Sequence, residues 1–144
     1  KLNKMGTRSL TKVIETYKDK ENKEYKTNLI CMYRQYDGYP SGHGQELCDF
    51  LFDRKIVNGY NMEHQRGKYN NGMGCLGAEL IQHFKDGVGN IYLYSPDTQD
   101  VWEDYTYLIE GNEKDQLKVK VMDCENKKIF EGSPSELQTY INEL

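Results

Sequence analysis

The chain has 144 residues, of which 37% are hydrophobic and 29% charged, and its net charge is −4 at pH 7. This length fits a single domain over residues 1–144, with enough core to fold without a metal or disulfide staple. The negative balance argues against a nucleic-acid binder, and no apolar run approaches the roughly 20 residues that span a bilayer.

The cysteines of the chain indicate a reducing compartment. Cys31, Cys48, Cys75 and Cys124 are widely spaced, with no C-x-x-C pair among them. Cys31 and Cys48 lie in apolar patterns, which predicts buried free thiols. Because disulfides form mainly in oxidising compartments, we expect a cytoplasmic location.

The N-terminal third of the chain predicts a β-hairpin. Residues 6–17 and 25–36 are rich in β-forming and apolar side chains, which is typical of strands. The charged stretch between them, residues 18–24, has no apolar member and therefore predicts an exposed turn.

Two helices are predicted after this hairpin. Apolar residues recur at three- and four-residue spacing over 45–55 and again over 76–84, where Gly87 provides a natural stop. The stretch between them, residues 58–74, is polar and rich in Gly and Asn. Since structureless loops of this length are uncommon in compact domains, it predicts a long functional loop or a mobile lid.

The C-terminal half is mostly β. Alternating patterns predict strands over residues 91–94, 105–109, 117–121 and 129–130. Ser133, Pro134 and Glu136 then form a capping box that starts a final helix. The order β-β-α-α-β-β-β-β-α predicts an α+β fold, with a mostly antiparallel sheet of about six strands and helices packed on one face.

The richest candidate site is the glycine-rich stretch 37–44, D-G-Y-P-S-G-H-G, which leads directly into the first helix. Free amides at such a helix start favour anions, and arginines on the two hairpin strands offer guanidinium groups to them. We expect this loop to form one wall of the main pocket. The predicted ligand-binding residues are Arg8, Arg34, Tyr36, Asp37, Gly38, Tyr39, Ser41, Gly42, His43 and Gly44.

Other interpretations of these residues remain open. The loop is also explained as a structural strand-to-helix turn shaped by Gly38 and Pro40. If the protein is an enzyme, His43 is the candidate general acid or base, but no other catalytic residue is predicted. The histidines and cysteines lack the close spacing of a metal site, so neither a metal nor a cofactor is predicted.

A second, smaller feature lies before the strand at 105–109. Trp102, Glu103 and Asp104 stand together there and could edge a pocket. A solvated turn that leads into a strand explains them equally well.

Three motifs resemble a family of small hypothetical proteins common in bacteriophage and metagenomic sequences. They are M-G-T-R-S at residues 5–9, D-G-Y-P-S at 37–41 with Gly44 following, and E-D-Y-T-Y-L at 103–108. Many members have a His-Trp pair where this chain has Gln35-Tyr36. The resemblance implies a phage or mobile-element origin and a natural start at Met5, with residues 1–4 a tag remnant or extension. It carries over no catalytic residue.

Three functions follow as hypotheses. The first is non-enzymatic binding of a phosphorylated or nucleotide-like small molecule, by analogy with small phage proteins that sequester host immune signals in the host cytoplasm. The second is a module that inhibits a host protein through a Tyr-rich sheet face. The third is a small hydrolase of a nucleotide or phosphate ester that uses His43. The sequence leaves the oligomeric state open, homo-oligomers included.

Overall fold

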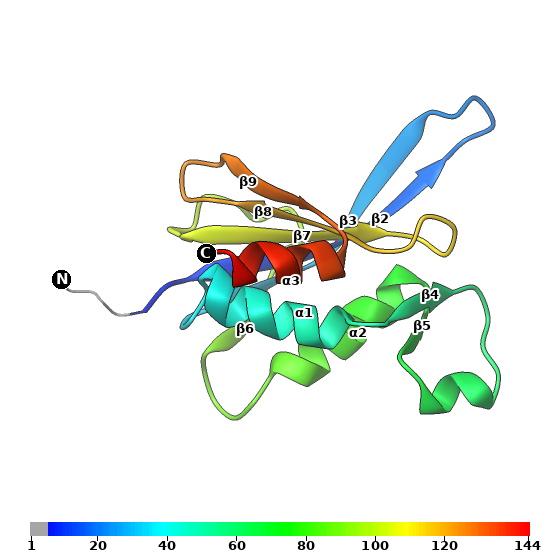
Figure 1. Cartoon of the computed structure of the whole chain (residues 1–144), viewed down its shortest axis with the longest axis horizontal. Coiled ribbons are helices and arrows are strands. Elements are labelled where there is room, and N and C mark those ends of the chain that lie inside the picture. The colour runs from blue at the N-terminus through cyan, green and yellow to red at the C-terminus, as the bar shows by residue number, and fades with distance from the viewer. Residues whose placement is uncertain (1–5) are drawn as a thin grey trace.

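The computed structural model describes residues 6–144, so the expectations for residues 1–4 and for a start at Met5 lie outside the described part. Three helices and eight strands form the fold (Figure 1). Their bounds are β2 Ser9–Lys18, β3 Glu24–Arg34, α1 Gln45–Leu51, β4 Lys55–Val57, β5 Tyr69–Asn71, α2 Gly72–Phe84, β6 Ile91–Tyr94, β7 Tyr105–Gly111, β8 Lys118–Met122, β9 Lys128–Gly132 and α3 Pro134–Asn142.

The main sheet has six strands in the order β6-β3-β2-β7-β8-β9. All neighbouring pairs are antiparallel except β2 and β7, which run parallel. The predicted α+β fold with a mostly antiparallel sheet is therefore confirmed. The parallel pair arises because β7 returns to the sheet beside β2 after a long excursion through α1, α2 and β6.

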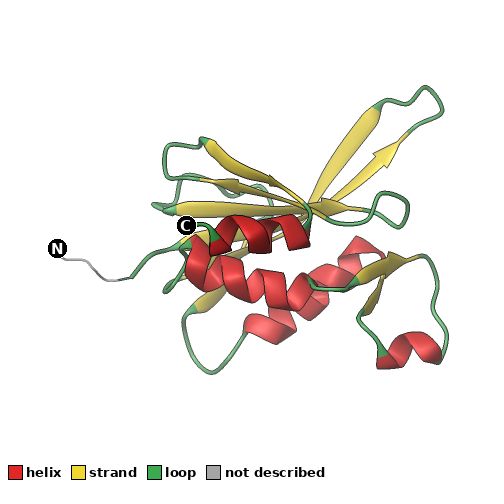
Figure 2. Cartoon of the chain, in the orientation of Figure 1, coloured by secondary structure: helices red, strands yellow, loops and turns green. Residues whose placement is uncertain are grey.

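The three helices lie on one side of this sheet and leave its other face open (Figure 2). Helix α2 packs on β2 and β3, and α3 packs on β8 and β9. Because side chains alternate along a strand, each strand sends every second residue into this helix-covered core. Val13, Met32, Tyr107, Ile109 and Val121 are such residues.

Two hairpin turns share one sequence pattern, D-x-E-N-K, at residues 19–23 and 123–127. In both, the aspartate carboxylate accepts the backbone amides two and four residues later. In both, the asparagine takes a positive φ, 65° at Asn22 and 62° at Asn126. Asparagine tolerates this conformation better than most residues, so the pattern specifies the turn.

Helix α3 begins as the sequence predicts. The Ser133 hydroxyl accepts the Glu136 amide, and the Glu136 carboxylate accepts the Ser133 amide at 2.8 Å. This reciprocal pair satisfies two amides that the first helical turn leaves free. Leu137 and Ile141 then face the core.

The stretch 58–74 is not a structureless loop. It contains a 3₁₀ helix at Glu63–Arg66 and strand β5, which pairs in parallel with β4. Arg54 anchors the pair, because its guanidinium donates to the Asn70 side-chain carbonyl at 2.9 Å and forms an ion pair with Glu79 at 3.2 Å. Within residues 6–144, none of the helices has the length and apolar character needed to cross a membrane.

Candidate functional site

The glycine-rich stretch 37–44 is the first turn of a helix. Pro40–Gly44 forms a π-helical turn that continues into α1. Its amides bond within the chain: Gly38 donates to the Thr7 carbonyl, His43 to the Asp37 carbonyl, and both Gly42 and Gly44 to the Tyr39 carbonyl. The prediction that these four amides are free for an anion is therefore wrong.

The glycines allow close packing of the chain against itself. A Cβ at Gly38 would lie 2.8 Å from the Ser9 Cβ, and one at Gly42 would lie 2.6 Å from the Asp37 carbonyl oxygen. Distances this short exclude any side chain. The absence of a side chain at these two positions is thus explained by the protein's own packing, without a ligand.

Arg34 and His43 form a buried polar network on the helix side of the sheet. His43 is fully buried, with Nδ1 3.0 Å from the Arg34 guanidinium and Nε2 2.7 Å from the Thr11 hydroxyl. Arg34 also donates to the Tyr36 carbonyl and pairs with Glu46 at 3.0 Å. Burial, with the nearby Arg34 charge, lowers the pKa of His43 to about 3.

These contacts make two predicted site residues, His43 and Arg34, unavailable to a ligand. Because guanidinium cannot accept a hydrogen bond, Nδ1 of His43 must be the acceptor. The ring proton is then on Nε2, which donates it in a hydrogen bond to the Thr11 hydroxyl oxygen. Neither nitrogen is available to a substrate, so His43 is not placed to act as a general acid or base. Arg34 is likewise occupied by the protein itself.

The remaining members of the predicted site lie at the surface of the turn. Tyr36, Asp37, Tyr39 and Ser41 are exposed, and the Tyr39 hydroxyl is 3.5 Å from the Asp37 carboxylate. None of the four lines the large groove described next. Their role in ligand binding stays a prediction.

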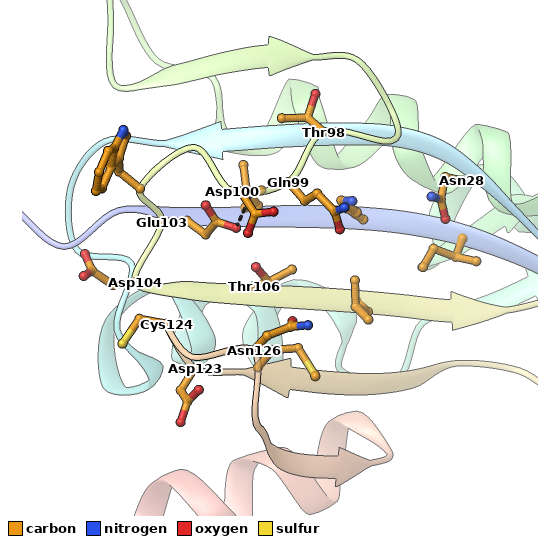
Figure 3. Close-up of a pocket in the computed structure, with 16 residues that line it drawn as sticks. Asn28, Thr98, Gln99, Asp100, Glu103, Asp104, Thr106, Asp123, Cys124 and Asn126 are labelled. Atoms are coloured by element: carbon orange, nitrogen blue, oxygen red, sulfur yellow. Dashed lines mark hydrogen bonds between the residues drawn. The ribbon is translucent and has the colours of Figure 1, made fainter.

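A groove of about 880 Å³ lies on the open face of the sheet, opposite the helices (Figure 3). Its floor is formed by alternate residues of β2 and β7, namely Leu10, Lys12 and Ile14 with Thr106 and Leu108. Strands β2 and β7 are central in the sheet, and Leu10 and Ile14 are buried, so the accessible surface of the groove combines polar and apolar atoms.

The segment that enters β7 borders the groove. Thr98, Gln99, Asp100, Trp102 and Asp104 all line it. The backbone of this segment is held in place, since Asp104 accepts the Arg8 amide at 2.9 Å. Asp100 and Trp102 both have positive φ, 58° and 68°. This conformation is uncommon for a residue as bulky as Trp, so a specific set of contacts must maintain it.

Glu103 supplies those contacts. Its two carboxylate oxygens accept two backbone amides, that of Asp100 at 3.2 Å (Figure 3) and that of Val101 at 2.8 Å. Val101 packs against a small cluster on the open face, formed by Leu10, Cys31 and Tyr33. The border of the groove is thus a fixed turn, and it presents Trp102 with 85% of its surface exposed.

Lys12 is the most unusual residue of this groove. It is only 8% exposed, between the buried side chains of Leu10 and Ile14. Within residues 6–144 no carboxylate lies within ion-pair distance of its ammonium, and the ammonium makes no hydrogen bond there. The stem of the side chain is covered by its neighbours, whereas the ammonium keeps contact with solvent, since Ser9 Oγ is the one fully buried side-chain polar atom without a partner among residues 6–144. The ammonium is therefore available to a ligand that accepts hydrogen bonds.

Arg8 belongs to this side of the sheet, apart from Arg34. Ser9 pairs with Arg34 and faces the helices, so Arg8, one residue earlier, faces the open side. Its guanidinium makes one long contact, 3.5 Å to the Trp102 carbonyl. Arg8 therefore stands at the border of the groove, whereas Arg34 lies beside the turn 37–44, so the two arginines do not face one site.

Sequence reasoning found part of this site. The expectation that Trp102, Glu103 and Asp104 edge a pocket is confirmed, because all three line the groove. Lys12 was missed. Its signal is a charged residue at the alternate position between two apolar ones, Leu10 and Ile14, of a single strand.

The groove lacks the features of a metal centre. No group of three His, Cys, Asp or Glu side chains within the described residues, 6–144, is arranged to hold a metal ion. Cys31 lies buried beneath this face, and burial raises the pKa of its thiol to about 11, so it is a poor nucleophile.

Comparison with protein-family models, with curated proteins and with solved structures finds no significant match. The geometry of the site is therefore the basis for a functional proposal.

Proposed function

We propose that the protein binds a phosphorylated or nucleotide-like small molecule in the open-face groove and does not convert it. The observation that carries this proposal is Lys12, a lysine 8% exposed that lines a groove of about 880 Å³ and has no partner within residues 6–144. Ligand pockets of this size are common for small molecules, and a few convergent polar groups in an apolar wall fix the ligand.

A nucleotide-like ligand offers groups that match these side chains. Its phosphate or base carbonyl accepts hydrogen bonds from the Lys12 ammonium. Its ring stacks on Trp102, as bases do on exposed aromatic side chains. Its hydroxyl or amino groups donate to Asp100, whose carboxylate has no hydrogen bond within the described residues, and Arg8 lies at the border for an anionic group.

Binding without turnover is supported by how the carboxylates of the groove are used. Glu103 and Asp104 accept backbone amides. Because a general acid or base must exchange its proton with the substrate, Glu103 and Asp104 are poorly placed for that role. Asp123 also accepts backbone amides, which leaves Asp100 as the one lining carboxylate without a hydrogen bond within residues 6–144. A binder that releases its ligand unchanged suits a sponge for an immune signal in the cytoplasm of a phage-infected host, and we propose this biological role.

Mass spectrometry of small molecules released by denaturing the purified protein tests the proposal. We expect a phosphorylated or nucleotide-like compound with the wild type and its loss with Lys12→Met, which keeps the length of the side chain without the charge. Lys20→Met, an exposed change in the hairpin turn, is the matched control and should retain the compound. Incubation with the same compound should return it intact, and a smaller product would favour a hydrolase.

An interaction module remains the second candidate, on one specific observation. Tyr33 and Tyr94 stack on the open face with ring centroids 5.0 Å apart, and Tyr92 lies beside them at 6.0 Å, with 48% of its surface exposed. Exposed aromatic clusters are enriched at protein interfaces. If the purified protein carries no small molecule but retains one host protein, and Tyr92→Ala abolishes that retention, this second function is the correct one.

A further inference from the structure

The charges around the groove carry an inference about the class of ligand, which rests on the proposed function. We infer that the groove accepts nucleotides with a single negative charge, such as phosphodiesters, and rejects nucleoside polyphosphates. The cation available for the ligand on the floor is Lys12, and the other charged side chains that line the groove are all acidic.

Four carboxylates line the groove: Asp100, Glu103, Asp104 and Asp123. They outnumber Lys12, the cation that lines the groove, and Arg8 at its border. Lys120 lies across from Leu108 on the same face, but it is paired with Glu110 at 3.4 Å. One ligand charge can be placed against Lys12. A further negative charge finds no second cation among the residues that line the groove, whereas four carboxylates line it, and like charges repel one another.

Three of these carboxylates cannot swing away from an approaching anion without losing hydrogen bonds to the backbone. Glu103 accepts the amides of Asp100 and Val101, and Asp104 accepts the Arg8 amide. The third, Asp123, is the aspartate of a D-x-E-N-K turn and accepts two amides there. The negative border is thus built into the fold.

Asp100 differs from the other three. Its side chain makes no hydrogen bond or ion pair within residues 6–144, although it lines the groove. Asp100 also has a positive φ, which asparagine tolerates. Asp100→Asn therefore removes one charge from the border while leaving the turn intact, and it isolates the electrostatic part of ligand selection.

Calorimetric titration with a matched set of probes tests the inference. Each of the four common nucleosides is compared as the free nucleoside, the 3′,5′-cyclic monophosphate and the 5′-triphosphate. For at least one base we expect the cyclic monophosphate to bind at least tenfold more tightly than either of the others. The difference in affinity between the triphosphate and the cyclic monophosphate should become smaller as the salt concentration is raised, because salt screens the repulsion.

Two variants separate the attraction of the ligand to Lys12 from its repulsion by Asp100. Lys12→Met should abolish the advantage of the cyclic monophosphate over the nucleoside. Asp100→Asn should strengthen triphosphate binding at least threefold. Asp86→Asn, at an exposed residue whose side chain makes no hydrogen bond or ion pair within residues 6–144, should leave it unaltered. A triphosphate that binds the wild type as well as or better than the cyclic monophosphate overturns the inference and leaves the proposed function standing. Failure of every probe to bind overturns both.

Discussion

Burial of His43 predicts that the protein loses stability as the pH falls from 7 to 5. In the unfolded chain the imidazole takes up a proton near its ordinary pKa of 6.5, whereas burial and the Arg34 charge lower its pKa to about 3 in the folded protein. Between these two values the unfolded state binds more protons, so the free energy of unfolding decreases as the pH falls.

The size of this loss follows from the same two values. Each pH unit below 6.5 costs about 1.4 kcal/mol, so His43 alone should remove about 2 kcal/mol of stability between pH 7 and pH 5. Urea unfolding of the wild type and of His43→Gln, measured at both pH values, isolates the contribution of His43 to the pH dependence of the free energy of unfolding. Glutamine cannot be protonated in this range, and the titration of the other groups is common to both proteins.

We expect the wild type to lose about 2 kcal/mol more than His43→Gln over this interval. His83→Gln, a change at an exposed histidine of α2, is the control and should follow the wild type. An equal loss in the wild type and in His43→Gln would refute the reasoning. It would mean that His43 exchanges its proton freely with solvent, and the turn at residues 37–44 would again be a candidate for acid-base chemistry.

Two further predictions concern the core and the border of the groove. Leu137→Ala should lower the free energy of unfolding by roughly 2–5 kcal/mol, because Leu137 of α3 is fully buried. A melting temperature within a degree of the wild type would show that this helix does not pack on the sheet. Arg8→Ala should weaken ligand binding at least tenfold, since a charge-assisted hydrogen bond contributes roughly 1.5–3 kcal/mol. The same variant should melt like the wild type, because the Arg8 side chain makes one 3.5 Å contact, and unchanged affinity would remove Arg8 from the site.

The parts of the fold that the sequence predicts are those specified by local chemistry. Ser133 and Glu136 cap α3 through side chains three residues apart, and the turn at residues 19–23 closes its hairpin through one aspartate. The parallel contacts of β2 with β7 and of β4 with β5 were not predicted. Strands β2 and β7 are distant in the chain, and strands β4 and β5 have only three residues each. In neither case does a local sequence pattern indicate the pairing.

Two expectations about the predicted site were wrong or incomplete, each for a physical reason. A glycine pattern shows that something approaches the backbone closely, but at Gly38 that neighbour is Ser9 of the same chain. One or both of the arginines were expected at the anion because their strands pair, whereas the register puts Ser9 opposite Arg34 and so sends Arg8 to the other face. Register depends on where the hairpin turn is centred, and a shift of one residue reverses every side chain.

The central claim is that the ligand lies on the open face of the sheet and not at the turn 37–44. Amide chemical shifts of the isotope-labelled protein, recorded during titration with the small-molecule fraction released from the unlabelled protein, test it most directly. Trp102 is the only tryptophan, so its indole signal is unambiguous. We predict large shifts for that indole and for the amides of residues 10–14 and 98–104, with residues 37–44 unchanged. Shifts confined to residues 37–44, with the Trp102 indole unmoved, would contradict the account.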